Sequence, residues 1–122
     1  MMAGRAEKVF EMPVADVYVL YERKIERKGG DVANLDAVIT WLTGFDKRTI
    51  KMHISAKTSF RAFFKAAHLN PKAKLITGSI CGVKIQEIDD PLMKRVRYLD
   101  KLVDEVANGR PMSKVLRESS AK

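Results

Sequence analysis

Residues 91–108 carry the most regular apolar pattern in the chain. Five aliphatic residues recur at alternating intervals of four and three positions: Leu92, Val96, Leu99, Val103 and Val106. This spacing places them on one face of an α-helix. Asp90 suits the N-cap, Pro91 the first helical position and Gly109 the residue after the helix. The pattern therefore predicts one long amphipathic helix, whose apolar face must pack against other elements.

Two shorter helices are predicted upstream, each bounded by helix-ending glycines. The first begins at Pro13 and ends before Gly29-Gly30; the second is capped by Asp31 or Asn34 and ends at Gly44. Apolar residues at helical spacing mark their buried faces: Val14, Val17, Tyr18, Tyr21 and Ile25 in the first, and Leu35, Val38, Ile39 and Leu42 in the second. Both stripes indicate helices that face a common core.

Three short helical segments follow from similar signals. Asp46 caps a segment that contains Ile50 and Ile54, and Thr58 or Ser59 caps one with an aromatic face. That face consists of Phe60, Phe63, Phe64 and Ala67. At the C-terminal end, Pro111 or Ser113 starts a last short helix with Met112, Val115 and Leu116.

The segment 75–88 has two interpretations. Asn70-Pro71 is a good helix start, and a helix from there would place Ala73, Ile76 and Ile80 on one face and end at Gly82. As a hairpin, the segment would turn at Gly78-Ser79 and continue in the alternating pattern of residues 83–86. We favour the helix for the first half and leave the second half open.

Length and composition set the fold class. A chain of 122 residues with 46% hydrophobic and 31% charged residues is long enough for one domain with its own core. We predict a single all-α domain over 1–122, an irregular bundle of five to six short helices with the option of a minor β-hairpin near residues 75–86. Residues 1–10 are expected to form an N-terminal arm and 118–122 a frayed tail.

The expected location is the cytoplasm of a bacterium. Cys81 is the single cysteine, so no internal disulfide can form. The N-terminus has no apolar run after its positive charge, as a secretory signal would, and no stretch is apolar enough for a membrane span.

The charge of the chain is concentrated in one segment. Residues 47–86 contain no Asp or Glu, although the chain as a whole has a formal net charge of +8. We take seven cations of this segment as candidate anion-binding residues: Lys47, Arg48, Lys51, Arg61, Lys65, Lys72 and Lys74. Clustered cations attract phosphates and other anions, and exposed aromatic rings among them could stack on bases, so nucleic-acid binding is one alternative. The competing interpretation is a solvated outer face over buried phenylalanines.

Catalytic and metal sites have weaker support. Cys81 could act as a nucleophile with His53 or His68 as base, yet no motif places either histidine beside it. The same three residues lack the paired spacing of zinc ligands. We therefore predict no metal and no cofactor, and keep a small enzyme that uses Cys81 as an alternative.

The long helix could also contact a second copy of the chain. The stripe from Leu92 to Val106 has the seven-residue period of a coiled coil, which makes these residues a candidate homo-oligomer interface. The pattern spans only two heptads, whereas a coiled coil usually needs three or four, so packing in the domain's own core is the favoured explanation. On the opposite face we expect Asp100, Asp104 and Glu105 to be solvated, with Lys101 and Glu105 paired.

Several motifs occur in an order typical of one family. They are Trp41-Leu42-Thr43-Gly44-Phe45-Asp46, Asn70-Pro71, Ile80-Cys81-Gly82-Val83, Glu87-Ile88, Asp90-Pro91-Leu92 and the run from Arg97 to Glu105. Together they resemble the bacterial "domain of unknown function 2200" family, over about Val9 to Leu116. The resemblance implies a compact multi-helical domain and assigns no activity and no site residues. The basic segment is not typical of that family.

The sequence thus favours a non-enzymatic binding or interaction module with a basic surface. The expected partner is anionic, either a nucleic acid or an acidic protein, and no membrane association is expected.

Overall fold

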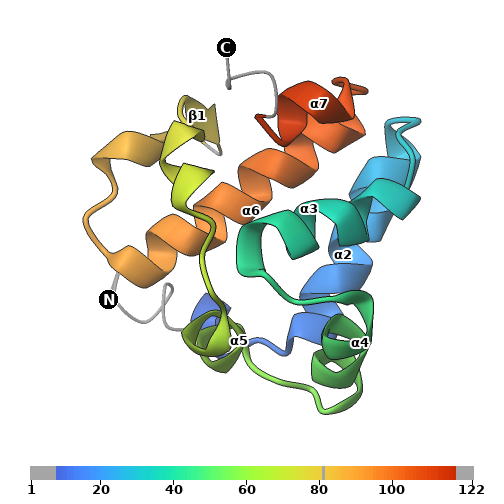
Figure 1. Ribbon diagram of the computed structural model, residues 1–122, viewed down its shortest axis with the longest axis vertical. Coiled ribbons are helices and arrows are strands. Elements are labelled where there is room, and N and C mark those ends of the chain that lie inside the picture. Colours follow the sequence, from blue (N-terminus) through green and yellow to red (C-terminus); the bar gives the residue numbers. More distant parts are fainter. Residues whose placement is uncertain (1–7, 81, 118–122) are drawn as a thin grey trace.

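The computed structural model describes residues 8–80 and 82–117 (Figure 1). Its α-helices are α2 (Val14–Arg27), α3 (Ala33–Thr43), α4 (Lys47–Ser55), α5 (Phe60–Ala66), α6 (Pro91–Ala107) and α7 (Met112–Val115). Two 3₁₀ helices, η1 (Pro71–Leu75) and η2 (Ile85–Glu87), flank the strands β1 (Ser79–Ile80) and β2 (Val83–Lys84). Residues 8–11 form a further helical turn. The predicted helical bundle with a minor hairpin is confirmed.

Helix α6 is the central element of the bundle. It contacts α2 and α3 on one side and α5, α7, β1 and η2 elsewhere along its length (Figure 1). Its predicted apolar stripe faces this core: Val96, Leu99, Val103 and Val106 are at most 3% exposed, and Leu92 is half-buried. The structure therefore places four residues of the candidate oligomer interface in the protein's own core, out of reach of a second copy.

Several predicted helix starts agree with the structure and depend on a short-range hydrogen bond. The side chains of Asp46, Ser59, Asn70 and Asp90 all accept backbone N–H groups of the helices they precede. Asp31 does the same for the N–H of Ala33, at 2.9 Å. Each such cap contributes about 1 kcal/mol to stability.

The helix that we favoured for the first half of the segment 75–88 is wrong, because the helix that begins at Pro71 ends at Leu75. Gly78 has φ +98° and Gly82 φ +79°, conformations that end an α-helix but suit turns. Ser79 instead pairs with Lys84 and Ile80 with Val83, with Gly82 between the strands rather than a turn at Gly78-Ser79. Ile76, Ile80 and Ile85 are buried and anchor the hairpin to the core. Cys81 lies outside the described residues.

The acidic face of α6 is also different from the prediction. Asp100 accepts a hydrogen bond from the Tyr21 hydroxyl at 2.5 Å, and Asp104 pairs with Lys24 at 3.1 Å. Glu105 pairs with Arg110 and Arg117 rather than with Lys101. Because α2 and the segment around α7 cover this face, its carboxylates hold helices together instead of facing solvent.

No helix in residues 8–80 and 82–117 has both the length and the apolar character of a membrane span.

Gly30 marks the closest approach between the α2–α3 loop and the end of α6. A Cβ at this position would lie 2.6 Å from the carbonyl oxygen of Val106 and 3.2 Å from Cα of Ala107. Both are backbone atoms, so Gly30→Ala requires the loop and α6 to move apart. We expect this substitution to lower the free energy of unfolding by about 1–3 kcal/mol, measured by urea denaturation.

Gly29→Ala is the neighbouring control. Gly29 has φ +83°, and beyond its chain neighbours no atom of the described residues lies within 4 Å of a Cβ placed there. Only the left-handed backbone therefore disfavours alanine at this position, by about 1 kcal/mol. Unchanged stability of Gly30→Ala would contradict the close approach.

Candidate anion-binding site

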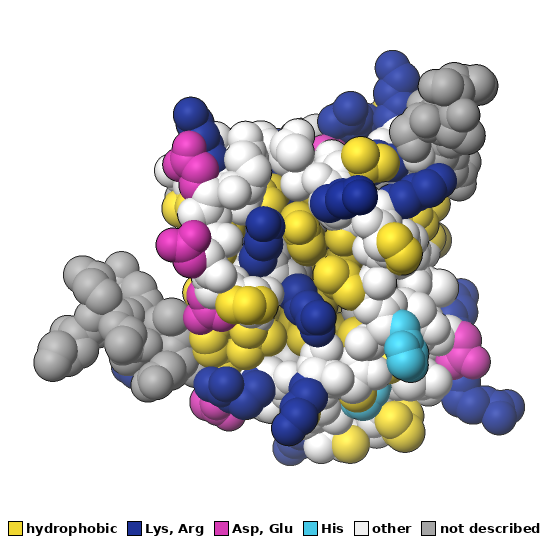
Figure 2. Space-filling model, turned by 60° about the vertical axis from the view of Figure 1, so that its left-hand side comes forward, with side chains coloured by type: hydrophobic (Ala, Val, Ile, Leu, Met, Phe, Trp, Pro, Cys, Tyr) yellow, Lys and Arg dark blue, Asp and Glu magenta, His cyan; other side chains and the backbone are white. Residues whose placement is uncertain are grey.

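The seven cations predicted to bind anions lie on three separate elements. Lys47, Arg48 and Lys51 are on α4, Arg61 and Lys65 on α5, and Lys72 and Lys74 on η1. Arg61 and Lys65 line one pocket together with Arg95, whereas Lys47 lines another beside Trp41 and Leu116. Figure 2 shows Lys and Arg side chains spread over one face of the molecule, separated by uncharged surface. The seven candidate cations thus lie on separate elements, and those that line a pocket divide between two pockets.

The aromatic residues of that segment belong to the core. Phe60, Phe63 and Phe64 are at most 2% exposed, so they cannot stack on bases. His53 is buried with them: its ring lies 4.9 Å from that of Phe45 and 5.3 Å from that of Phe63, and its Nδ1 is 3.0 Å from Thr58 Oγ1. Burial lowers the pKa of His53 below its ordinary value.

Among the described residues, no group of three or more His, Cys, Asp and Glu side chains could hold a metal ion. His68 is exposed, and His53 is enclosed by aromatic rings.

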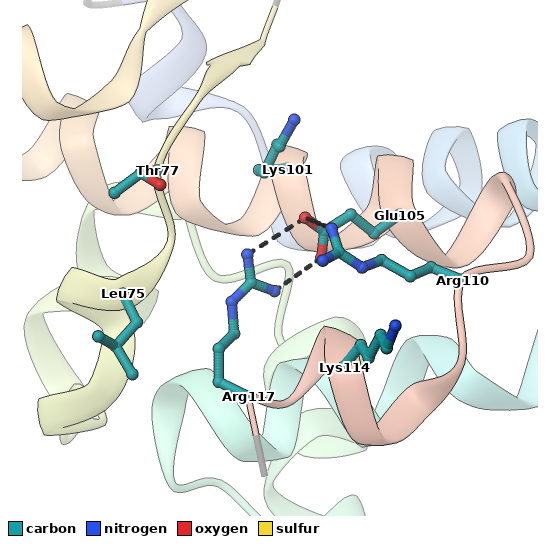
Figure 3. Close-up of a pocket in the computed structure, with 7 residues that line it drawn as sticks. All are labelled: Leu75, Thr77, Lys101, Glu105, Arg110, Lys114 and Arg117. Carbon is teal, nitrogen blue, oxygen red and sulfur yellow. Dashed lines mark hydrogen bonds and ion pairs between the residues drawn. The ribbon is translucent and has the colours of Figure 1, made fainter. Parts of the chain in front are cut away.

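A different cluster of cations surrounds a pocket of about 480 Å³ near the C-terminal end (Figure 3). We call it the C-terminal basic pocket. Its lining residues are Leu75, Thr77, Lys101, Glu105, Arg110, Lys114 and Arg117. Lys101 and Glu105 come from α6, Arg110 from the following turn, and Lys114 and Arg117 from α7 and the residues just after it. Leu75 and Thr77 form the opposite wall (Figure 3).

The local sequence explains how these residues meet. Lys101 and Glu105 are four positions apart and therefore project from neighbouring turns of α6. After α6, Gly109 takes φ +79°, and the N–H of Arg110 donates to the Glu105 carbonyl at 3.1 Å, which reverses the chain. Pro111 then precedes α7, which runs back beside α6 and returns Lys114 and Arg117 to Glu105.

Glu105 is the electrostatic centre of the pocket. Arg117 donates to both of its carboxylate oxygens, from Nη1 to Oε1 at 2.7 Å and from Nη2 to Oε2 at 3.1 Å. Arg110 Nη1 donates to Oε2 at 3.1 Å. The Glu105 and Arg117 side chains are 6% and 12% exposed, whereas Arg110 is 47% exposed. Arg117 is therefore fixed in the wall, and Arg110 remains accessible to a ligand.

The two lysines of the pocket, Lys101 and Lys114, differ in the hydrogen bonds that they form. Lys101 Nζ donates to the carbonyl oxygen of Ser79 at 3.2 Å, which ties α6 to the hairpin. The Lys114 ammonium group forms no hydrogen bond or ion pair with residues 8–80 and 82–117, and its side chain is exposed. With four cations around one carboxylate, the pocket keeps a positive excess that can attract an anion.

This pocket was not foreseen from the sequence. Arg110, Lys114 and Arg117 lie outside residues 47–86, in a short stretch between Glu105 and Glu118 that was not considered as a basic segment. The signal in the sequence was the spacing of these three cations, which follow Gly109 and are separated by four and then three positions. It indicates one cationic face but not which carboxylate that face meets.

Comparison with known proteins identifies the family. None of the curated proteins matches the sequence. The fold is similar to that in the structure described as "Crystal structure of uncharacterized protein SP1917", with a TM-score of 0.87 and 40% sequence identity over 93% of this chain and 94% of that one. The model of the family "Uncharacterized protein conserved in bacteria (DUF2200)" matches residues 8–117. The protein therefore belongs to the DUF2200 family, as its motifs predicted.

Proposed function

We propose that this protein is a non-enzymatic module that binds a phosphate-bearing small molecule in the C-terminal basic pocket. The observation that carries the proposal is the convergence of Lys101, Arg110, Lys114 and Arg117 on one pocket that contains a single carboxylate. These residues come from different turns of the chain, so only the fold brings them together.

The donors suit phosphate. A guanidinium group presents paired N–H groups that match two oxygens of a phosphate, and an ammonium group supplies a mobile point charge. Arg110 and Lys114 are the accessible examples of each. The exposed residue Thr77 on the opposite wall adds a hydroxyl group.

The size of the pocket favours a small ligand over nucleic acid. Its volume of about 480 Å³ lies within the usual range of small-molecule sites. A nucleic acid would instead need cations arranged along a longer track.

We expect pyrophosphate to bind the wild-type protein at low salt, measured by isothermal titration calorimetry. Lys114→Glu should weaken this binding about tenfold or more, because it replaces an attraction by a repulsion in the pocket. Lys114 is exposed and unpaired within the described chain, so the variant should remain folded.

Lys51→Glu is the matched control, since it makes the same change of net charge on α4, where Lys51 is also exposed. Equal weakening by the two variants would show that only overall charge matters and would refute the pocket. Tighter binding of a DNA duplex than of pyrophosphate, with loss on Lys51→Glu, would favour the nucleic-acid alternative instead.

A further inference from the structure

A second pocket lies between α5 and the first turns of α6. Its lining residues are Arg61, Lys65, Pro91, Leu92 and Arg95, and its volume is about 320 Å³. We call it the α5–α6 pocket. It shares no residue with the C-terminal basic pocket. Three of its five lining residues are cationic and none is acidic, which makes it selective for anions on charge alone.

Two of its cations contact other groups of the protein, and Arg95 is the more firmly held of the two. Arg95 Nη1 donates to the carbonyl oxygen of Phe64 at 2.9 Å. Arg61 Nε donates to Glu11 Oε2 at 2.8 Å, and its guanidinium carbon lies 5.3 Å from the centre of the Phe10 ring. Holding Arg95 in advance reduces the entropy that a ligand must remove on binding. The Glu11 pair is exposed on both sides and is therefore weak enough for a ligand to compete with it.

The remaining wall is apolar. Leu92 is the one member of the α6 stripe that the core buries only in part, and Pro91 beside it is exposed. The first N–H groups of α6 are already used, because those of Leu92 and Met93 donate to Asp90 Oδ1 at 2.9 and 3.3 Å. An anion in this pocket must therefore bind to the side-chain cations, and any group attached to it contacts Leu92 and Pro91.

We propose that the α5–α6 pocket binds a carboxylate joined to a short apolar chain. The cations receive the carboxylate, and the apolar chain covers Leu92 and Pro91. The volume of the pocket, about 320 Å³, is suited to a small ligand. This site is independent of phosphate binding in the other pocket.

The test compares octanoate, acetate and 1-octanol as probes in NMR titrations of the wild-type protein, with octanoate below its micelle concentration. Octanoate is expected to shift the backbone amides of residues 61–65 and 92–95 and to bind at least tenfold more tightly than either other probe. A fully buried methylene group contributes up to about fourfold in affinity, so a few buried carbons suffice.

Three variants separate the charge of each pocket from the apolar contact with Leu92. Lys65→Glu should abolish octanoate binding and leave pyrophosphate binding within twofold, while Lys114→Glu should do the reverse. Leu92→Ala should reduce the preference for octanoate over acetate by about fivefold or more without changing acetate binding.

Equal affinities for acetate and octanoate would overturn the proposal, and so would octanoate binding that Lys65→Glu leaves intact. Octanoate shifts outside residues 61–65 and 92–95 would also overturn it. Failure of pyrophosphate to bind refutes the other pocket only, since neither probe depends on the other.

Discussion

Glu105→Ala is expected to lower the free energy of unfolding by about 3 kcal/mol, at the lower end for a broken buried ion pair because Arg110 is half exposed. The loss arises at Arg117, whose side chain is 12% exposed and donates to both Glu105 oxygens. Without the carboxylate, this largely buried guanidinium group loses both hydrogen bonds to Glu105, and α7 loses the ion pair that links it to α6. Urea denaturation followed by circular dichroism measures the change.

Glu105→Gln separates the structural role of Glu105 from its effect on ligands. The amide keeps the shape of the side chain but removes the negative charge, so we expect pyrophosphate to bind at least about fivefold more tightly. One charge at about 4 Å has this effect in water, and a buried site screens charge less than water does. Weaker binding by this variant would contradict the interpretation of Glu105 as a competitor of the ligand. The corresponding control is Glu11→Gln, which removes one negative charge at an exposed site outside the lining of the C-terminal basic pocket.

Phe63→Ala should lower the free energy of unfolding by about 3–5 kcal/mol, the range for truncation of a buried aromatic residue. Phe63 is 1% exposed, and its ring lies 5.1 Å from that of Phe45 and 5.4 Å from that of Phe64. Its loss leaves a cavity where α5 meets the core. Met52→Ala is the control: Met52 is 54% exposed, so its truncation should change stability by less than about 0.5 kcal/mol.

The same substitution should change how stability depends on pH. Burial lowers the pKa of His53 in the folded protein, so the unfolded chain binds a proton at higher pH than the folded one does. This contribution to stability is fully present above the ordinary pKa of 6.5 and is lost as the pH falls through the lower pKa of the folded state. In Phe63→Ala, water reaches His53, its pKa returns toward 6.5, and the loss of stability below pH 6.5 becomes smaller.

Denaturation at several pH values between neutral and mildly acidic measures this effect. His68→Gln is the control and should leave the pH dependence unchanged, because His68 is exposed. A His53→Gln variant with the pH dependence of the wild type in this window would show that another group is responsible.

Helix boundaries were predictable because they depend on neighbouring residues. Asp46, Ser59, Asn70 and Asp90 cap helices through bonds that span only two or three positions. The buried apolar stripe of α6 could also be predicted, since the spacing of its residues follows from the geometry of an α-helix. The hairpin was harder to predict, because its two-residue strands are too short to show an alternating pattern. It is held in place by contacts of the buried residues Ile76, Ile80 and Ile85 with the core.

The candidate sites depended on contacts between distant parts of the chain. The concentration of charge in residues 47–86 was real in the sequence, but the fold distributes these cations over α4, α5 and η1. Of the predicted set, Arg61 and Lys65 share a pocket, and they do so with Arg95, which is thirty positions from Lys65 and was not among the candidates.

The sequence by itself determined that the chain folds into a helical bundle, where most of its helices begin and end, and that it is a DUF2200 protein. These properties follow from local hydrogen bonds, helical periodicity and matching motifs. Only the tertiary structure decided that Glu105 is buried between two arginines and that Lys101, Arg110, Lys114 and Arg117 share one pocket. The reason is physical: a helix has a solvent-facing side only until another element covers it, and the sequence does not say which element that is.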